Sequence, residues 1–312
     1  MRAFIFPGQG SQAVGMGASL AEASRTVRDT FAEVDEALGQ NLFKLMREGP
    51  EDALKLTENA QPAIMALSLA VFRALTKDGG VILEKAASFV AGHSLGEYSA
   101  LCAAGSFDLA TTAKLLKLRG QAMQAAVPVG QGGMAALLGA DLDLATRIAQ
   151  AAAEGEICTV ANDNDPSQVV ISGDKGAIDR AVELAKAMGA KRAILLPVSA
   201  PFHCPLMKPA ADAMEEALAK VKVKAPAVPL YANVTAEPCA DPKAIVAQLV
   251  EQVTAMVRWR ESVANMAAAG VDEFVELGGK VLGPMVKRIA PDANVVSLVT
   301  IDDIEAAAKE LH

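Results

Sequence analysis

The pattern with the clearest chemical content is the pentapeptide Gly-His-Ser-Leu-Gly at positions 92–96. It fits the G-x-S-x-G pattern of a nucleophile elbow, in which a serine lies on a sharp turn between a strand and a helix. The turn needs glycines because a Cβ would strain it. It would present the Ser94 hydroxyl at a helix N-terminus, where unpaired N–H groups favour a developing oxyanion. The alternative interpretation is an ordinary glycine-rich turn.

A serine hydroxyl is a poor nucleophile without a base. The chain has three histidines, at positions 93, 203 and 312. We expect His93 to shape the turn beside Ser94 rather than deprotonate it, and His312, the last residue, to be solvated. His203 is then the candidate general base, although a lone histidine is more often structural. The histidines lack the H-E-x-x-H spacing of a zinc site, so we expect neither a metal nor a cofactor.

Arg119 is the third candidate site residue. It ends the segment Leu-Leu-Lys-Leu-Arg at 115–119, which has helical character and is followed by Gly120. On these residues alone, the ordinary interpretation is a solvated cation that complements the dipole at a helix C-terminus. A helix ending at Gly120 would fit that interpretation.

An elbow requires a buried strand before it and a helix after it. Residues 86–91 form an apolar run that predicts the strand, and we expect the helix to begin near Leu95. Residues 2–6 predict a second buried strand, which a proline and a glycine end, and a loop rich in glycine and glutamine covers 8–12. A strand, a glycine turn and a helix in this order are typical of an α/β protein.

Residues 132–198 show a separate alternation that predicts the order β-α-β-β-α-β of a ferredoxin-like unit. The predicted strands cover 133–138, 157–161, 168–172 and 192–198, the helices 142–153 and 176–188, and a turn 162–166. We therefore expect an α/β fold with two parts. A catalytic core comprises 1–128 and 199–312, and a small subdomain, 129–198, is inserted into it.

The remaining segments are predicted more coarsely. Residues 19–75 have a helical period, with expected breaks near Gly39, Gly49-Pro50 and Gln61-Pro62. Further helical stretches are expected near 205–221 and 242–268, and two short strands at 273–277 and 295–299.

Composition excludes several classes of protein. The 29 basic and 37 acidic residues give a net charge of −8 without any basic run, which argues against nucleic-acid binding. Four scattered cysteines, at positions 102, 158, 204 and 239, are expected to be free buried thiols in a reducing compartment. The uncharged stretch 120–140 contains glycines and a proline, so we interpret it as a helix end, linker and strand rather than a membrane span. We expect a cytoplasmic protein, a monomer.

Four motifs occur in order: Phe-Pro-Gly-Gln-Gly-Ser-Gln at 6–12, Gly-His-Ser-Leu-Gly-Glu-Tyr at 92–98, Leu-Arg-Gly at 118–120 and Phe-His-Cys at 202–204. Together they resemble the malonyl-CoA:acyl-carrier-protein transacylases, the acyltransferases of bacterial type II fatty-acid synthesis. The similarity runs across nearly the whole chain. It implies an α/β-hydrolase-like core with a ferredoxin-like insertion, in agreement with the interpretation above.

The resemblance also implies roles for individual residues. Ser94 would be acylated and His203 would be its base, while the backbone N–H groups of Gln9 and Leu95 would form the oxyanion hole. Arg119 would hold the malonyl carboxylate. A backbone carbonyl, matched loosely to Gln252, would orient His203. An aspartate there would repel the substrate carboxylate.

Two further positions bear on specificity and loop shape. In related domains a bulky Phe before the histidine accompanies malonyl units, so Phe202 is a candidate specificity residue, with core packing as the alternative. The family usually has Gly-Pro-Gly where this chain has Gly278-Gly279-Lys280, which puts the contacts of that loop in doubt.

The implied reaction moves a malonyl group from coenzyme A to acyl carrier protein through a malonyl-Ser94 intermediate, by a ping-pong mechanism. Because carrier proteins are acidic, docking would need local cations; the candidates are the pairs Lys191-Arg192 and Lys287-Arg288, or these are simply solvated. A serine hydrolase would need an acidic partner for the histidine. A non-catalytic scaffold would be expected to have lost Ser94, His203 or Arg119.

Overall fold

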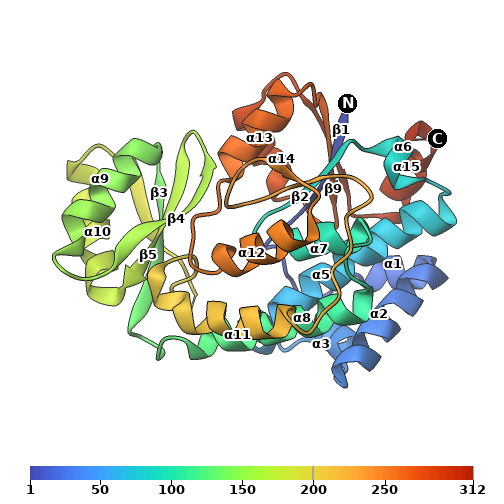
Figure 1. Cartoon of the computed structure of the whole chain (residues 1–312), viewed down its shortest axis with the longest axis horizontal. Helices are drawn as coiled ribbons and strands as arrows, with labels where there is room; N and C mark the ends of the chain where they lie inside the picture. Colours follow the sequence, from blue (N-terminus) through green and yellow to red (C-terminus); the bar gives the residue numbers. More distant parts are fainter. Residues whose placement is uncertain (199, 312) are drawn as a thin grey trace.

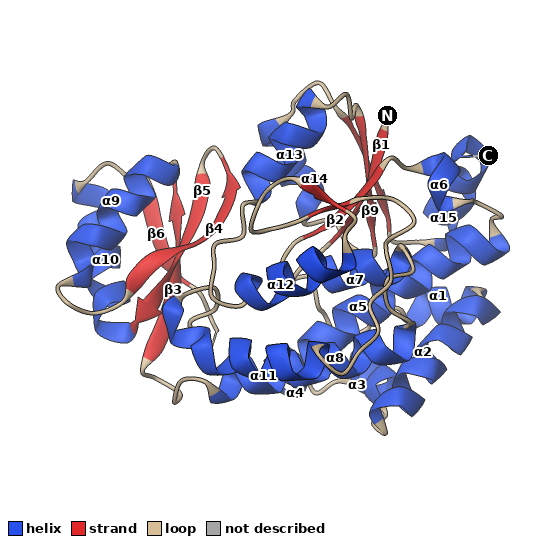
Figure 2. Cartoon of the chain, in the orientation of Figure 1, coloured by secondary structure: helices blue, strands red, loops and turns tan. Residues whose placement is uncertain are grey.

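The computed structural model describes residues 1–198 and 200–311 and shows a mixed α/β protein with two sheets (Figures 1 and 2). The larger sheet has the order β10-β9-β1-β2-β7-β8, parallel except for β8. Its strands are β1 (Arg2–Phe6), β2 (Phe89–Gly92), β7 (Leu230–Tyr231), β8 (Pro238–Cys239), β9 (Glu273–Leu277) and β10 (Asn294–Leu298). The predicted strands 2–6 and 273–277 are confirmed. The strand predicted at 86–91 lies three residues later at its start, and β7 and β8 are too short to be predicted.

Strands β1 and β2 are neighbours, and their carboxyl ends bring two loops together. Phe6 pairs with Gly92, so the loop 8–12 and the elbow 93–96 leave the same edge of the sheet. The contact is close because Gly96 has no side chain: a Cβ there would lie 2.2 Å from the Phe6 carbonyl oxygen. The sheet therefore fixes the relative position of two motifs that are more than eighty residues apart.

Helices surround the larger sheet (Figure 2). They are α1 (Ala18–Ala23), α2 (Arg25–Leu38), α3 (Leu42–Glu48), α4 (Glu51–Lys55), α5 (Thr57–Arg73), the π-helical turn η1 (Ala74–Asp78), α6 (Leu83–Ala86), α7 (Gly96–Ala103), α8 (Leu109–Ala125), the 3-10 turn η2 (Pro205–Met207), α11 (Lys208–Leu218), α12 (Pro242–Gln252), α13 (Trp259–Ala268), α14 (Leu282–Ile289) and α15 (Ile301–Leu311). No helix among the described residues is both long and apolar enough to cross a membrane.

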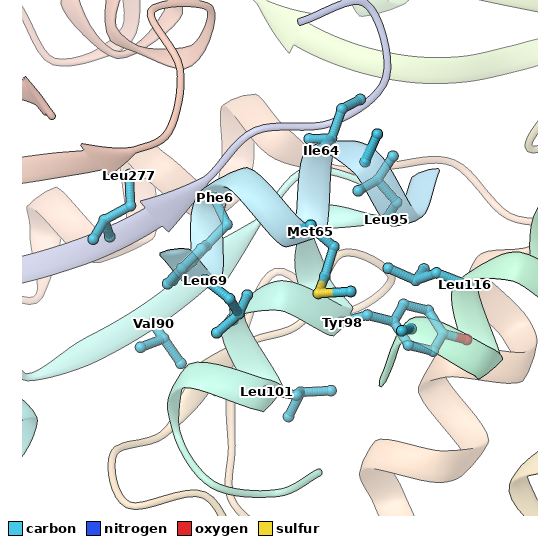
Figure 3. Packing of buried hydrophobic residues seen from close by; sticks show 14 of the residues in the cluster. Phe6, Ile64, Met65, Leu69, Val90, Leu95, Tyr98, Leu101, Leu116 and Leu277 are labelled. Atoms are coloured by element: carbon cyan, nitrogen blue, oxygen red, sulfur yellow. The ribbon is translucent and has the colours of Figure 1, made fainter. Parts of the chain in front are cut away.

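Aliphatic side chains and few aromatic ones fill the main core. Figure 3 shows Phe6 and Val90, from β1 and β2, beside side chains of α5 and of the helix that follows Ser94. The residues labelled there are all almost completely buried: Phe6, Ile64, Met65, Leu69, Val90, Leu95, Tyr98, Leu101, Leu116 and Leu277. Helix α7 is thereby held firmly against the sheet, and the elbow that precedes it cannot move independently.

The second sheet comes from the middle of the chain and has the order β4-β5-β3-β6, entirely antiparallel. The predicted order β-α-β-β-α-β is the one found: β3 (Gly132–Leu138), α9 (Leu142–Ala153), β4 (Cys158–Asp165), β5 (Gln168–Asp174), α10 (Lys175–Ala187) and β6 (Arg192–Leu195). Both helices pack against this sheet over an apolar cluster of its own, separate from the main core (Figure 1).

The turn predicted at 162–166 is shorter and lies later, because β4 continues to Asp165 and the chain turns only at 166–167. Contacts with the other part of the molecule explain the extension. Asn162 forms a parallel bridge with Val257, and the buried carboxylates of Asp163 and Asp165 pair with arginines of α13 and α14. Residue types that usually favour a turn are thus held in a strand by tertiary contacts.

Two predicted helix boundaries are also wrong, and one break inside a predicted helical stretch was not predicted. Helix α5 passes through Pro62, since nearly its whole length is buried and packing outweighs the lost hydrogen bond. Helix α8 passes through Gly120, which lies where α8 meets the start of α5: a Cβ there would be 2.6 Å from Glu58 Cα and from the Thr57 oxygen. The stretch predicted at 242–268 is two helices, separated at 253–258.

We predict that Gly120→Ala lowers the free energy of unfolding by about 1–3 kcal/mol, because the new methyl group meets backbone atoms that cannot move aside. Denaturant unfolding would measure this. Gly176→Ala is the matched control in α10, where a Cβ would meet only the ends of the Glu156 and Arg180 side chains. It should be neutral or stabilising by up to about 1 kcal/mol. Equal stability of the two variants would contradict the close packing of α8 on α5.

Candidate active site

Ser94 lies at the turn between β2 and α7 in a left-handed backbone conformation, with φ of 54°. A Cβ on Gly92 would lie 1.9 Å from the Gly96 oxygen, so the turn can close only with glycine there. The Ser94 N–H donates to Asn233 Oδ1 at 2.8 Å, and Asn233 Nδ2 donates to the Gly92 oxygen at 2.7 Å. The predicted strand–turn–helix context is therefore present, and a side chain from after β7 supports it.

His203 is brought to Ser94 from the segment that returns from the second sheet. Its Nε2 lies 2.7 Å from Ser94 Oγ, and its Nδ1 lies 2.8 Å from the Gln252 backbone oxygen. A carbonyl oxygen can only accept, so Nδ1 carries the hydrogen and Nε2 presents a lone pair to the hydroxyl. Burial, and then the Arg119 charge, lowers the pKa of His203 to about 3. The imidazole is consequently neutral and able to accept a proton at neutral pH.

Arg119 is not a solvated cation: it lies inside α8 and is 1% exposed. Its Nη2 donates to Ser94 Oγ at 3.1 Å and to Gln252 Oε1 at 2.8 Å, and its Nη1 donates to Gln61 Oε1 at 2.8 Å. The guanidinium also lies over the Tyr98 ring, 5.7 Å from its centroid. Every one of these partners is neutral, and no described carboxylate forms an ion pair with Arg119.

The Gln252 carboxamide connects Arg119 with the elbow. Its Nε2 donates to the Ser94 oxygen at 3.0 Å and to Glu97 Oε2, and lies 3.2 Å from Asn233 Oδ1. The other oxygen of Glu97 accepts the Asn233 N–H at 3.1 Å. Glu97 is 1% exposed, and burial raises its pKa to about 7 against the opposing effects of these N–H donors and Arg119.

A cavity of about 380 Å³ opens onto Ser94, His203 and Arg119. Its walls combine polar and charged side chains with apolar ones. The lining residues that bear on recognition are Gln9, Lys55, Gln61, Met123, Met134 and Phe202. Phe202, 7% exposed, thus borders the cavity as well as packing against the core.

Gln9 and Leu95 flank the serine from the two loops at the edge of the sheet. Gln9 borders the cavity, whereas the Leu95 side chain is buried beneath the elbow and only its backbone lies beside Ser94. Neither backbone N–H donates a hydrogen bond to another described residue. Gly8 allows the close approach of the loops, because a Cβ there would lie 2.6 Å from the His93 oxygen.

The other histidines and the cysteines are outside this arrangement. His93 Nε2 lies 2.7 Å from Asn164 Oδ1, so its ring faces the second sheet rather than the hydroxyl. Cys204 donates to the Pro201 oxygen, and all four cysteines are free, with Cys158 and Cys204 buried and the other two partly exposed. His312 lies outside the described residues. Within 1–198 and 200–311, no cluster of His, Cys, Asp and Glu could hold a metal.

Three polar residues of the site were given no role by the sequence: Gln61, Asn233 and Glu97. Gln61 was visible only as a glutamine beside a proline. Glu97 belongs to the elbow motif, but nothing about an acid after a glycine indicates that it is buried. Asn233 follows a two-residue strand and carried no signal. These residues are recognisable only when α5, α7 and the segment after β7 are seen to meet.

The two basic pairs that are candidates for carrier docking differ in their surroundings. Arg288 pairs with Asp165 and Lys287 donates to the Ala293 oxygen, so that pair is engaged within the molecule. Lys191 and Arg192 are exposed. The loop after β9 is held by Glu276, whose carboxylate accepts the N–H groups of Val281, Leu282 and Gly283 at 2.8–3.0 Å and so caps α14.

A histidine-paired serine on such an elbow, within a two-sheet α/β fold, is typical of enzymes that transfer or hydrolyse acyl groups. The family model described as the acyl transferase domain matches residues 3–280. The chain is therefore an acyltransferase.

Full-length relatives narrow this class. The malonyl CoA-acyl carrier protein transacylase of Escherichia coli K12 is 46% identical over 310 residues, 99% of each chain. The crystal structure of the acyl-carrier-protein-S-malonyltransferase of Bartonella henselae is 53% identical, with a TM-score of 0.97 over 99% of each chain. A complex of a type II PKS acyl-carrier protein with its malonyl-transacylase is 41% identical, with a TM-score of 0.95 over 99% of each chain. The chain belongs to the malonyl CoA-acyl carrier protein transacylase family.

The lowered pKa of His203 predicts a specific acid sensitivity of the fold. Between pH 6.5 and 3 the unfolded chain protonates this histidine and the folded protein does not, so stability from the neutral imidazole is lost as pH falls. The difference in unfolding free energy between the wild type and His203→Gln should decline by about 1.4 kcal/mol per pH unit below 6.5. Urea titrations from pH 7.5 to 4.5 would measure it. Parallel curves for the two proteins would rule out a buried neutral histidine.

Proposed function

We propose that this acyltransferase moves a malonyl group from coenzyme A to the phosphopantetheine thiol of acyl carrier protein, by a ping-pong mechanism with a malonyl-Ser94 intermediate. The observation that carries the proposal is the meeting of three groups on one cavity: a hydroxyl, a neutral imidazole and an arginine whose contacts are all neutral. The first two perform acyl transfer, and the third selects an acyl group that ends in a carboxylate. The names of the relatives support the choice of substrate.

Acylation begins with His203 Nε2 accepting the hydroxyl proton of Ser94 as Oγ attacks the thioester carbonyl carbon of malonyl-CoA. The 2.7 Å contact already has the length that this transfer requires. The tetrahedral intermediate collapses by breaking the C–S bond, and the proton on Nε2 passes to the coenzyme A sulfur. The backbone oxygen of Gln252 holds the ring throughout and stabilises the imidazolium.

The backbone N–H groups of Gln9 and Leu95 are the proposed oxyanion hole. Both lie beside Ser94, at the edge where β1 and β2 end, and both lack acceptors among the described residues. Leu95 also precedes the N-terminus of α7, so the helix dipole adds to the stabilisation of negative charge.

Arg119 is proposed to bind the free carboxylate of the malonyl group. A guanidinium held by the amide oxygens of Gln61 and Gln252 is oriented without being neutralised, so its full charge remains for the substrate. An acid in place of the Gln252 carbonyl would repel that carboxylate, which gives a reason for the neutral partner of His203. Phe202, on the wall of the cavity, is proposed to limit branching next to the thioester.

The second half-reaction uses the same groups with the carrier thiol as nucleophile. His203 accepts the thiol proton, the sulfur attacks the ester carbonyl, and Ser94 Oγ leaves with the proton returned to it. We propose that the acidic carrier approaches past Lys191 and Arg192, because β6 runs from Arg192 directly into the cavity wall at 196–198. Both side chains are exposed.

For the architecture we propose an α/β-hydrolase-like core, 1–128 and 199–312, and a ferredoxin-like subdomain, 129–198. The apolar cluster between the smaller sheet and its two helices, all of it within 129–198, supports this division, while the other face of that sheet packs on the main core through Met134, Ala136 and Val170. Two observations support a ferredoxin-like insertion. The smaller sheet has the order β4-β5-β3-β6, and its two helices pack against it over one apolar cluster.

Ser94→Ala should abolish the malonyl adduct, because no other hydroxyl lies within hydrogen-bond distance of His203 among the described residues. Intact-mass spectrometry after mixing with malonyl-CoA would detect the adduct on the wild type. Ser99→Ala is the matched control: this serine lies in α7, and its buried hydroxyl has no hydrogen-bond partner among the residues that the structure describes, so the adduct should persist. An adduct on the Ser94 variant would refute the assigned nucleophile.

Arg119→Ala should reduce kcat/KM for malonyl-CoA about 10²-fold more than for acetyl-CoA, since a charge-assisted hydrogen bond contributes about 1.5–3 kcal/mol and acetyl makes none. Steady-state transfer with both donors would give the two values. Arg180→Ala removes a partly exposed arginine from helix α10 and should leave the ratio of the two kcat/KM values unchanged. Equal losses for the two donors in Arg119→Ala would show that Arg119 only supports the fold.

A further inference from the structure

Glu97 is a buried acid beside the site with no part in the steps above. It follows Ser94 by three residues and lies in the first turn of α7, and it neither borders the cavity nor contacts His203 or the Ser94 hydroxyl. Its two oxygens both accept N–H groups, one from the Asn233 backbone and one from Gln252 Nε2. An acid buried this completely is costly, so its hydrogen bonds must matter to the fold or to the site.

The contacts of Gln252 show what Glu97 determines. A carboxamide can occupy its place in two orientations that differ only in exchanging oxygen and nitrogen. In the observed orientation the nitrogen faces three oxygens, from Ser94, Glu97 and Asn233, and the oxygen faces Arg119. The inverted orientation would direct an N–H at the guanidinium and leave Arg119 Nη2 without that acceptor.

We propose that Glu97 is a positioning residue that holds the Gln252 carboxamide with its oxygen toward Arg119, and thereby sets the selectivity for a carboxylate-bearing acyl group. The inference rests on the proposed function, because it assigns the origin of the selectivity that Arg119 provides. Of the three oxygens that face Gln252 Nε2, only that of Glu97 belongs to a carboxyl group, which in its ionised form is the strongest acceptor of the three.

Replacing the carboxylate by a carboxamide tests this. In Glu97→Gln, the single side-chain oxygen can accept only one of the two N–H groups. The Asn233 N–H belongs to the backbone and cannot turn, so the new NH₂ group would face Gln252 Nε2. Gln252 would then invert or withdraw, and Arg119 would lose an acceptor in either case. A misplacement of about 1 Å near reacting groups can cost about 10²-fold in rate.

An alternative role for Glu97 predicts the opposite change in the preference for malonyl over acetyl donors. If the acid acted through its negative charge, it would weaken the attraction of Arg119 for the substrate. Its removal would then raise the preference for malonyl over acetyl donors. The direction in which this preference changes therefore separates positioning from charge.

The measurement is the ratio of kcat/KM for malonyl-CoA to that for acetyl-CoA. In Glu97→Gln we expect the ratio to fall about 10-fold, toward the value of Arg119→Ala, as expected when an oriented charge-assisted contact is weakened. An unchanged or increased ratio would overturn the proposal. Absence of a malonyl adduct on the wild type would instead refute the proposed function, so the two failures are distinguishable.

Two further variants separate positioning from general destabilisation. Glu276→Gln alters another fully buried acid, which accepts three backbone N–H groups at the start of α14 and the Ser297 hydroxyl, and should lower stability while leaving the ratio unchanged. Gln252→Met removes the carboxamide itself and should lower the ratio. Adding Glu97→Gln to Gln252→Met should then lower the ratio no further, since both changes act through one group.

If Glu97→Gln does not fold, Glu97→Asp provides the test. It keeps the charge and both acceptor oxygens but withdraws them by one methylene from Gln252. We expect a smaller fall in the ratio, in the same direction. A Glu97→Asp enzyme that discriminates as the wild type does would overturn the proposal.

Discussion

A guanidinium charge that is buried away from water without a carboxylate in contact is the constraint on which this site depends. Such a charge is tolerated only when oriented dipoles replace its hydration. The replacement comes from the amide oxygens of Gln61 and Gln252, on helices α5 and α12. Helix α5 lies close to Arg119 because α8 packs on the start of α5 at Gly120 without a side chain between them. A direct acid partner would be simpler to bury, but it would neutralise the charge that we propose binds the substrate carboxylate.

Gln252 connects the Arg119 guanidinium with His203, the proposed base. Gln252 contacts His203 through its backbone oxygen and Arg119 through its side chain, so one position at the end of α12 orients both the proposed base and the proposed carboxylate site. The elbow is tied in as well, since Gln252 also donates to the Ser94 oxygen. A shift of α12 would consequently disturb nucleophile, base and specificity together, which couples the stability of that helix to every step.

The sequence predicts the parts of this site that depend on neighbouring residues, and it misses the parts that depend on residues far apart in the chain. Ser94 is recognisable because the elbow is local, and the six elements of the smaller sheet follow from periodicity. Gln61 and Asn233 could not be assigned, because an amide gains meaning only from partners far away in the chain. Gly120 was misinterpreted as a helix end for the same reason: its neighbour is α5. Residues 162–165, which the sequence predicts as a turn, are likewise held in strand β4 by ion pairs with residues far away in the chain.

The ion pairs at the end of β4 have a mechanical consequence. Asp163 and Asp165 are almost wholly buried, and each is paired with an arginine of the larger part, while Asn164 meets His93 at the elbow. Moving the smaller sheet away would break both ion pairs and the contact between Asn164 and His93 at once. The end of β4 therefore works as a clasp: three consecutive side chains, Asp163, Asn164 and Asp165, fasten the smaller sheet to the larger part beside the elbow.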